Sequence, residues 1–593
     1  MIRVTLLVSL MFFSAAHVFT QTPKKPTPTS SLCTRTNAID NTKQQILSTR
    51  TFDQPAQRIA VLLRAADLLW PHDQERSMAT FIEAFDLAVQ NFKEQGDQVK
   101  RTSQSQFAAA IALPDQRFKV ISALAKRDPA KARKLSQQML DDAARDAVDK
   151  PDNLSQMRTA EKLLTLAHGL VATDAALALT FARLSLRYPA TMHLNGFLYY
   201  LARTDRSGAD SFYQEVLAAY GAAPMDQFLY LSAYPFGNTR DAGEMPSYTV
   251  YAVPEGYVGN QSLQRAFTQR LLARAQAGAE SAVEPASNRL AEPGQMWLAL
   301  TRLEKQVQTN LPDLYDVAVQ ARDRLYTLLN PPTQKRVTST IAGDERPKRT
   351  FDELIEAAEK RRNPDDRDRE IALAAIQTSR GEPLEKVLNV IDKISDTTLR
   401  ASVLNWFYFF GAQSRITDKN LDEARKYATK VTELDLRAYL FSRIAEESIK
   451  EAGDQTQARE LLNEIGDAAM KAPKTIVTAR ALLALANLYA KIDVNRGIEE
   501  LGNAVKTINA IESPDFSQQF TMMKLEGKTF GSFASFPTPG FNPENAFSEM
   551  GKVDFDSSLM QATTFTDKSL RALTTLAVLE PCFEVAPKTR KAK

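Results

Sequence analysis

Apolar side chains recur at helical spacing along most of the chain. The stretch DQTQARELLNEIGDAA runs from Asp454 to Ala469, and its apolar positions share one face of a helix. These positions are Ala458, Leu461, Leu462, Ile465 and Ala469. Asp454 stands where a side chain is needed to cap the first turn. The pattern therefore predicts a helix that starts at Asp454 and buries one stripe of side chains.

The same pattern of capping acid and apolar positions recurs in DPAKARKLSQQMLDDA, which begins at Asp128. Ala132 there takes the place of Ala458, four residues after the capping acid, and weaker copies begin at Asp174 and Asn420. A cap followed by a small residue lets a helix begin cleanly and lie close to a neighbouring helix. These recurrences predict packing positions and not catalytic ones.

Four consecutive segments in the C-terminal half predict helices joined by short turns: 436–450, 454–470, 477–491 and 493–511. Matching positions recur after 34 residues between Ala424 and Ala458, and after 46 residues between Ala132 and Ala178. Periods in this range belong to stacked helical hairpins, each of which buries its apolar face against the next. We therefore expect an all-α fold, an α-solenoid of stacked helical hairpins with two aromatic-rich loop insertions.

One stretch of the C-terminal half resembles a tetratricopeptide repeat. In TARALLALANLYAKIDVNRGIEELGNAV, Leu485, Ala486 and Tyr489 stand where that family places its Leu, its Gly or Ala, and its Tyr. The resemblance covers about a third of the chain. It implies a helical scaffold with a concave face that binds a protein or a peptide.

The first insertion, 221–259, interrupts the helical pattern with five glycines and four prolines. Long segments without helical period inside a repeat array are often functional. Tyrosine joins a flat apolar ring to a hydroxyl group, which suits contact with a peptide or a glycan. The candidate binding residues are Tyr230, Tyr234, Tyr248, Tyr251 and Tyr257.

The second insertion, 513–557, carries eight phenylalanines, from Phe516 to Phe555. Side chains without a hydroxyl group favour burial in a groove of the chain's own fold. Contact with a partner is the alternative.

Breaks in the periodic pattern define the expected organisation of the chain. At 331–350, proline, glycine and charged residues replace the helical pattern, which indicates a linker. The expected segments are a signal peptide (1–20), a Pro/Thr/Ser linker (21–32), an N-terminal helical-repeat region (33–330), the linker (331–350), a C-terminal helical-repeat region (351–586) and a basic tail (587–593).

The first residues, MIRVTLLVSLMFFSAAHVFTQTP, place one arginine before a short apolar run and then small residues. This is the layout of a secretory signal peptide. No other segment approaches the roughly 20 apolar residues of a spanning helix. We expect an exported protein, periplasmic or extracellular, with no transmembrane segment after signal cleavage.

The two cysteines, Cys33 and Cys582, lie near opposite ends of the mature chain. Export would allow them to form a disulfide. A bridge requires their Cα atoms to lie within about 7 Å of each other, and nothing in the sequence brings the two ends together. The sequence therefore favours two separately buried thiols, with a bridge as the alternative.

Composition and motifs limit the classes of function and ligand that we expect for this chain. The net charge is only +3, from 74 basic and 71 acidic residues, so no strong field would attract a nucleic acid. The histidines and cysteines lack metal-ligand spacing, and no phosphate-binding loop, dinucleotide-binding turn or nucleophile elbow is present. We expect no catalytic residue, no metal, no cofactor and no nucleic-acid partner.

These observations favour an exported, non-enzymatic helical-repeat scaffold that binds a protein or a peptide. The alternative is a glycan-active enzyme or a glycan-binding protein on an α/α-toroid, because such folds also stack helical hairpins. An enzyme of that class requires two carboxylates about 5 to 10 Å apart. The nominated acids are Asp241, Glu244 and Glu255, all within the first insertion.

Overall fold

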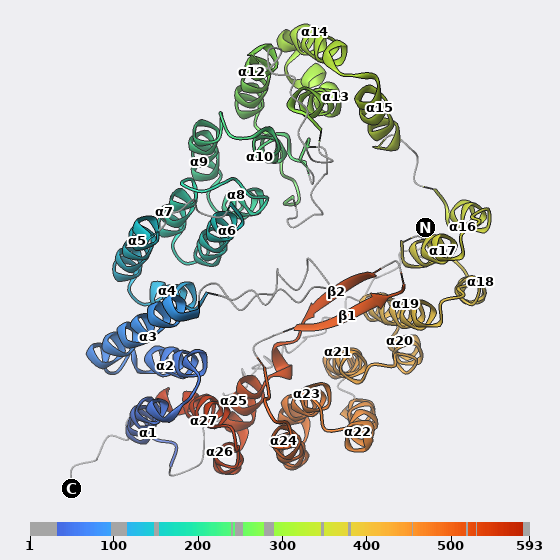
Figure 1. Cartoon of the computed structure of the whole chain (residues 1–593). Helices are drawn as coiled ribbons and strands as arrows, with labels where there is room; N and C mark the ends of the chain where they lie inside the picture. Colours follow the sequence, from blue (N-terminus) through green and yellow to red (C-terminus); the bar gives the residue numbers. More distant parts are fainter. Residues whose placement is uncertain are drawn as a thin grey trace, which may run out of the picture. The chain divides into compact units, whose positions relative to one another are not determined.

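The described part of the chain is mostly helical with almost no strand, which confirms the predicted all-α fold (Figure 1). The computed structural model describes residues 32–95, 115–146, 153–238, 241–243, 253–277, 290–344, 349–377, 381–452, 455–516, 520–528 and 531–584. It divides into two compact units. The middle unit is Gln44–Ser395, and the terminal unit joins Met1–Lys43 to Asp396–Lys593.

The middle unit contains helices throughout its described length. They are η1 (Thr49–Thr51), α2 (Pro55–Leu69), α3 (Gln74–Gln95), α4 (Gln116–Ala125), α5 (Pro129–Asp146), α6 (Asn153–Leu170), α7 (Ala175–Ser185), α8 (His193–Ala202), α9 (Arg206–Ala219), α10 (Met225–Tyr230), α11 (Ala233–Phe236), α12 (Gln261–Ala277), α13 (Glu292–Asn310), α14 (Pro312–Leu328), α15 (Pro331–Asp344), α16 (Phe351–Glu359), α17 (Pro364–Gln377) and α18 (Leu384–Ile391).

The described part of the terminal unit is helical apart from one two-stranded sheet. Its elements are α19 (Thr397–Thr417), α20 (Leu421–Ala428), α21 (Leu434–Ala452), α22 (Gln455–Lys471), α23 (Ile476–Ile492), α24 (Val494–Ile508), β1 (Phe520–Glu526), β2 (Gly531–Pro537), η3 (Pro539–Phe541), α25 (Pro543–Val553), α26 (Phe555–Thr563) and α27 (Lys568–Phe583). Helix α1 (Arg35–Ser48) begins in this unit and ends in the middle unit.

In both units, several helices pack on the next helix in sequence or on the one after it. In the terminal unit, α19 contacts α20 and α21, α21 contacts α22 and α23, and α23 contacts α24 and α25. In the middle unit, α2, α4, α6 and α8 form a row in which each contacts the next (Figure 1). A file of helical hairpins requires contacts of this kind, because no hairpin can bury its apolar face alone.

Side-chain caps begin several helices at the predicted positions. The Asp128 carboxylate accepts a hydrogen bond from the Lys131 backbone N–H at 2.9 Å, and the Asp174 carboxylate accepts one from Leu177 at 2.9 Å. Each bond satisfies a donor that the first helical turn leaves without a partner. Ala132 and Ala458, the small residues after two of the predicted caps, are fully buried. The predicted packing role of these alanines is confirmed.

The predicted linker 331–350 differs from the observed structure. Helix α15 occupies Pro331–Asp344, and Val337 on this helix is fully buried beside Leu298 and Leu329. Proline is tolerated in the first turn of a helix, where its missing N–H would have no helical partner. The two compact units also divide the chain at other places, after Lys43 and after Ser395.

An antiparallel hairpin lies on the helices of the terminal unit. Strands β1 and β2 pair over their whole length, with Phe520 opposite Pro537 and Glu526 opposite Gly531. Strand β1 packs against α19 and α21 (Figure 1). Three alternate residues of β1 are buried: Thr521, Met523 and Leu525. The hairpin therefore covers part of the surface of the helices that carry it.

Phenylalanines of the second insertion are packed inside the terminal unit. The Phe536 ring lies 4.6 Å from that of Phe409 and 5.8 Å from that of Tyr439. Three further members of the insertion are buried: Phe541, Phe547 and Phe555. For these residues the structure agrees with the interpretation that the Phe-rich segment fills spaces in its own fold.

The two cysteines are bonded to each other, in contrast to the two separate thiols that the sequence favoured. Cys33 and Cys582 form a disulfide with a Cα–Cα distance of 5.1 Å, and both residues are buried. The Arg35 side chain also donates a hydrogen bond to the Phe583 carbonyl oxygen at 3.1 Å. The start of α1 is thereby fixed to the end of α27.

Among the helices of the described part of the chain, none combines the length and the apolar character needed to cross a membrane.

Candidate functional site

The first insertion is built into the middle unit by its tyrosines. Tyr234 is fully buried, and Tyr230 and Tyr257 are half-buried. Tyr248 and Tyr251 lie outside the described residues. Because the Tyr234 ring has no exposed surface, it supports the insertion and offers nothing for a partner to contact.

Four tyrosines form a cluster, here called the tyrosine frame. Its members are Tyr199 on α8, Tyr213 on α9, Tyr234 on α11 and Tyr257 in the segment before α12. The Tyr234 ring lies 5.4 Å from Tyr199, 5.5 Å from Tyr213 and 5.5 Å from Tyr257, centroid to centroid. Ring pairs at such distances attract each other through dispersion and their quadrupoles. The frame joins helices α8, α9 and α11 to the segment before α12.

Hydroxyl groups of the frame donate to backbone carbonyls of the insertion. The Tyr213 hydroxyl lies 3.0 Å from the Leu231 oxygen, and the Tyr257 hydroxyl lies 2.9 Å from the Tyr234 oxygen. The Tyr199 hydroxyl lies within reach of two carbonyls, at 2.8 and 3.0 Å. These carbonyls lie in or beside the short helices α10 and α11, whose ends leave carbonyl oxygens with room for a further donor.

The carboxylate of Asp210 on α9 links the frame to the polar surface around it. It accepts hydrogen bonds from the Tyr234 hydroxyl at 2.7 Å, the Arg206 guanidinium at 3.0 Å and the Asn260 amide at 2.8 Å. Burial raises the pKa of Tyr234, and it raises the pKa of Tyr257 to about 12. Both hydroxyls therefore stay protonated at neutral pH and remain donors.

Replacement of Tyr234 with phenylalanine tests the role of this hydroxyl. We expect Tyr234→Phe to lower the free energy of unfolding of the middle unit by about 1–3 kcal/mol, because Asp210 loses a donor in a partly buried site. Tyr188→Phe is the matched control, since the half-buried Tyr188 hydroxyl makes no hydrogen bond among the described residues. Urea unfolding measures both variants. Equal losses for the two would contradict this role.

The segment Pro254–Val258 forms an exposed turn on the frame. Its backbone closes with a hydrogen bond from the Tyr257 N–H to the Pro254 oxygen at 3.0 Å, and Gly256 adopts φ +72°. The Arg206 guanidinium lies 4.2 Å from the centre of the Tyr257 ring and donates to the Val258 oxygen at 3.1 Å. The Val258 side chain is 77% exposed. An apolar side chain is thus held in solvent on a fixed support.

A second part of the insertion, 241–243, is also fixed to the fold. The Ala242 N–H donates to the Ser232 hydroxyl at 2.8 Å, and the Arg302 side chain on α13 donates to the Gly243 oxygen. Asp241, one of the nominated acids, is 4% exposed and accepts from the Gly243 N–H at 2.8 Å. Glu255 is exposed on the turn, and Glu244 lies outside the described residues. The Asp241 carboxylate therefore stabilises its own loop.

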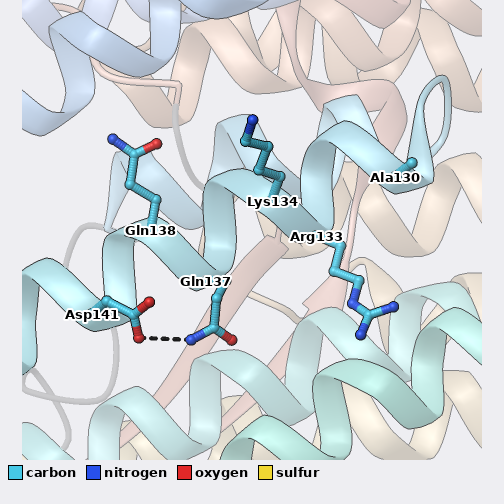
Figure 2. A pocket seen from close by; sticks show the side chains of 6 residues that line it. All are labelled: Ala130, Arg133, Lys134, Gln137, Gln138 and Asp141. Atoms are coloured by element: carbon cyan, nitrogen blue, oxygen red, sulfur yellow. Dashed lines mark hydrogen bonds between the residues drawn. The ribbon is translucent and has the colours of Figure 1, made fainter.

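The surface of α5 carries an open hollow of about 570 Å³. Its lining residues all come from this one helix: Ala130, Arg133, Lys134, Gln137, Gln138 and Asp141 (Figure 2). The Gln137 amide donates to the Asp141 carboxylate at 2.6 Å. Every lining side chain is exposed or half-buried, so the hollow is the solvated polar face of a helix.

Within the described ranges, no group of three or more histidine, cysteine, aspartate or glutamate side chains is placed to hold a metal ion. The polar groups gathered around the tyrosine frame instead bond to one another and to the backbone.

Four residues of this site were not singled out from the sequence: Tyr199, Tyr213, Arg206 and Asp210. Arg206 and Asp210 stand at i, i+4 spacing, which a pattern search could have marked as an ion pair. No sequence signal separates the two tyrosines from other aromatic core residues, because their partners are backbone atoms of a distant segment.

No protein-family model matches the chain, and no curated protein matches its sequence.

Proposed function

We propose that this chain is an exported, non-enzymatic helical-repeat scaffold that binds a protein or a peptide. The turn Pro254–Val258 is the contact surface assigned to this function. The observation that carries the assignment is the exposure of Val258 on a turn that Arg206 and Tyr257 hold in place. A surface that is already ordered loses little conformational entropy on binding, which favours affinity.

The helix contacts support the scaffold part of the proposal. Rows of helices in which each packs on a near neighbour, such as α2, α4, α6 and α8, present long surfaces of the kind that repeat proteins use for binding. The order of a repeat protein comes from these local contacts, so one insertion can change without loss of the whole fold. The tyrosine frame shows how such an insertion is attached here.

Export is supported by the buried disulfide as well as by the N-terminal sequence. Disulfides form and persist in oxidising compartments and are rare in the cytosol. Cys33 and Cys582 are the only cysteines of the chain, and both are used in the bond. A periplasmic or extracellular location follows from this proposal.

Capture of partners from an envelope fraction tests the assigned surface. The mature wild-type chain is immobilised and compared with Val258→Ser, which removes the exposed apolar side chain and keeps the anchors of the turn. We expect the apparent affinity for the captured partner to fall by roughly tenfold or more in the variant. Deletion of the whole insertion would be a poor test, because it removes the buried side chains of Phe228 and Tyr234.

The control is Val317→Ser, the same change at a 40% exposed valine on α14. It should leave capture unchanged. If Val258→Ser retains the captured partner as well as this control does, the turn is not the contact surface.

A further inference from the structure

The disulfide joins two sulfur atoms that are carried by different parts of the terminal unit. Cys33 lies two residues before the first residue of α1, and Cys582 lies in the last turn of α27. Both residues are buried, at 3% and 0% exposure. Exchange between thiols and disulfides requires direct contact between sulfur atoms. An external disulfide donor therefore has to react before the start of α1 packs on the end of α27.

Helix α27, which carries Cys582, is held in place by contacts that do not involve Cys33. It packs on α25 and α26, and its side chains are buried along most of its length. At Gly551 of α25 the two helices approach so closely that an added Cβ would lie 3.2 Å from the Val578 Cα. The position of Cys582 is therefore set by the packing of its own helix.

The start of α1, in contrast, is attached to α27 mainly by the bond itself. The other printed contact between them is the hydrogen bond from the Arg35 side chain to the Phe583 oxygen at 3.1 Å. One side-chain hydrogen bond adds little stability by itself. Leu32, next to Cys33, is 54% exposed. In a chain that lacks the bond, we therefore expect Cys33 to be the more accessible of the two thiols.

The charges near the two sulfurs favour the same order of reaction. A thiolate at Cys33 lies beside the start of α1, where the helix dipole is positive, and Arg35 adds a positive charge. A thiolate at Cys582 lies at the end of α27, where the dipole is negative, between Glu580 and Glu584 in the sequence. The thiolate is the nucleophile in disulfide exchange. Cys33 is therefore favoured as the first sulfur to react.

The distance along the chain gives a third reason for this order. Cys582 follows Cys33 by 549 residues, so Cys33 is synthesised long before its partner exists. These are the only two cysteines of the chain, so oxidation has a single intramolecular product and no wrong pairing to correct. Formation of the bond thus needs a disulfide donor and no reshuffling of bonds.

We propose that Cys33 is the acceptor site for a protein disulfide donor, a dithiol oxidase of the compartment to which the chain is exported. The Cys33 thiolate attacks the donor disulfide and forms a mixed disulfide, which releases one donor thiolate. The Cys582 thiolate then attacks the Cys33 sulfur, forms the Cys33–Cys582 bond and releases the second donor thiolate. Two electrons pass from the two cysteines to the donor, and the two thiol protons end on the donor thiolates. The inference rests on the proposed export, to which it adds a maturation reaction and its order.

Reaction with oxidised glutathione as the disulfide donor tests this order on the mature full-length chain. Cys582→Ser leaves the Cys33 thiol, and the matched variant Cys33→Ser leaves the Cys582 thiol. Under native conditions, we expect the mixed disulfide to form roughly tenfold or more faster at Cys33 than at Cys582. In concentrated urea, the two rates should agree within about twofold, because the fold no longer distinguishes the two thiols. Mass spectrometry of the intact chain measures both rates.

A second measurement uses the reduced wild-type chain, so it does not depend on the folding of a variant. Samples are quenched with acid at early times and digested, and the glutathione adduct is located by mass spectrometry. The adduct should appear on the peptide that contains Cys33 and should disappear as the Cys33–Cys582 bond forms.

Three results would overturn the proposal: equal rates for the two variants under native conditions, an adduct that appears first on Cys582, or an adduct on Cys33 that persists without forming the native bond. Both measurements use the purified chain, so their failure would leave the proposed export and partner binding standing. A cytosolic chain in cell fractionation would instead contradict the proposed export, and with it the compartment assigned to the donor.

Discussion

Replacement of Cys33 and Cys582 with serine is expected to lower the free energy of unfolding of the terminal unit by about 2–5 kcal/mol. The bond joins residues 549 positions apart, and the chain-entropy treatment of so long a loop gives about 6 kcal/mol. Any structure that the middle unit retains after the terminal unit unfolds shortens the effective loop, so the smaller range applies. The reduced wild-type chain should show the same loss.

The loss should be localised in the structure. Without the bond, the start of α1 keeps the hydrogen bond from Arg35 to the Phe583 oxygen, which contributes little by itself. Hydrogen exchange should therefore accelerate first in α1 and in the last turns of α27. The double serine variant controls for other effects of the reducing agent, because the agent should no longer change its unfolding. An unfolding transition that is identical with and without the bond would contradict this expectation.

Replacement of Arg480 with methionine is expected to cost the terminal unit about 3–5 kcal/mol and to release the hairpin from the helices. Arg480 is only 8% exposed, and its guanidinium donates to the Phe520 oxygen and to the hydroxyls of Thr521 and Thr538. Both hydroxyls are buried, so the variant leaves them without this donor in a site that water does not reach. Guanidinium unfolding measures the loss.

The free energy of unfolding that Arg480→Met loses should increase as the pH rises. Burial raises the pKa of Asp435, and the charge of Arg480 opposes that rise. A carboxyl group whose folded pKa lies above its unfolded value contributes stability below the unfolded value, and this contribution is lost as pH rises through the folded value. Removal of Arg480 raises the folded pKa further, so the penalty increases through the mildly acidic range above the usual carboxyl pKa.

Asp435→Asn in the Arg480→Met background is the matched test of this coupling. It removes the uncompensated carboxylate, so it should restore part of the stability and abolish the added pH dependence. A double variant with the same pH profile as Arg480→Met would show that Asp435 is not the titrating group.

The helices of the C-terminal half could be predicted closely because their signals are local. The segment expected at 477–491 is observed as α23, Ile476–Ile492, and the segment expected at 454–470 is observed as α22, Gln455–Lys471. A cap and an apolar stripe are properties of a few adjacent residues, so a single sequence contains them.

Elements whose stability comes from distant residues could not be predicted. The hairpin forms because Arg480 holds the ends of both strands and because Phe536 packs on α19 and α21, and neither contact is visible in the sequence of the insertion. Meeting of Cys33 and Cys582 is likewise a property of the folded terminal unit. Helix α15 was missed for a different reason, since prolines at its start were interpreted as helix breakers.

The roles of the candidate binding tyrosines also depend on distant residues and could not be predicted from the sequence. Composition marked 221–259 as a loop, whereas the structure places the short helices α10 and α11 within it. Composition also does not distinguish a tyrosine that faces a partner from one that faces a carbonyl of its own chain. The Tyr234 hydroxyl donates a hydrogen bond to the Asp210 carboxylate, and the Tyr257 hydroxyl donates one to the Tyr234 backbone oxygen. Among the described residues of this segment, the exposed large apolar side chain is that of Val258, which no aromatic pattern would select.

Residue-level hydrogen exchange across 253–260, 520–528 and 531–537 tests most directly the claim that the turn and the hairpin are ordered before a partner binds. Amides of Ser532, Ala534 and Phe536, which face β1, and the amide of Tyr257 should exchange as slowly as those of the neighbouring helices. Fast exchange throughout both segments, as in an unfolded chain, would contradict the account.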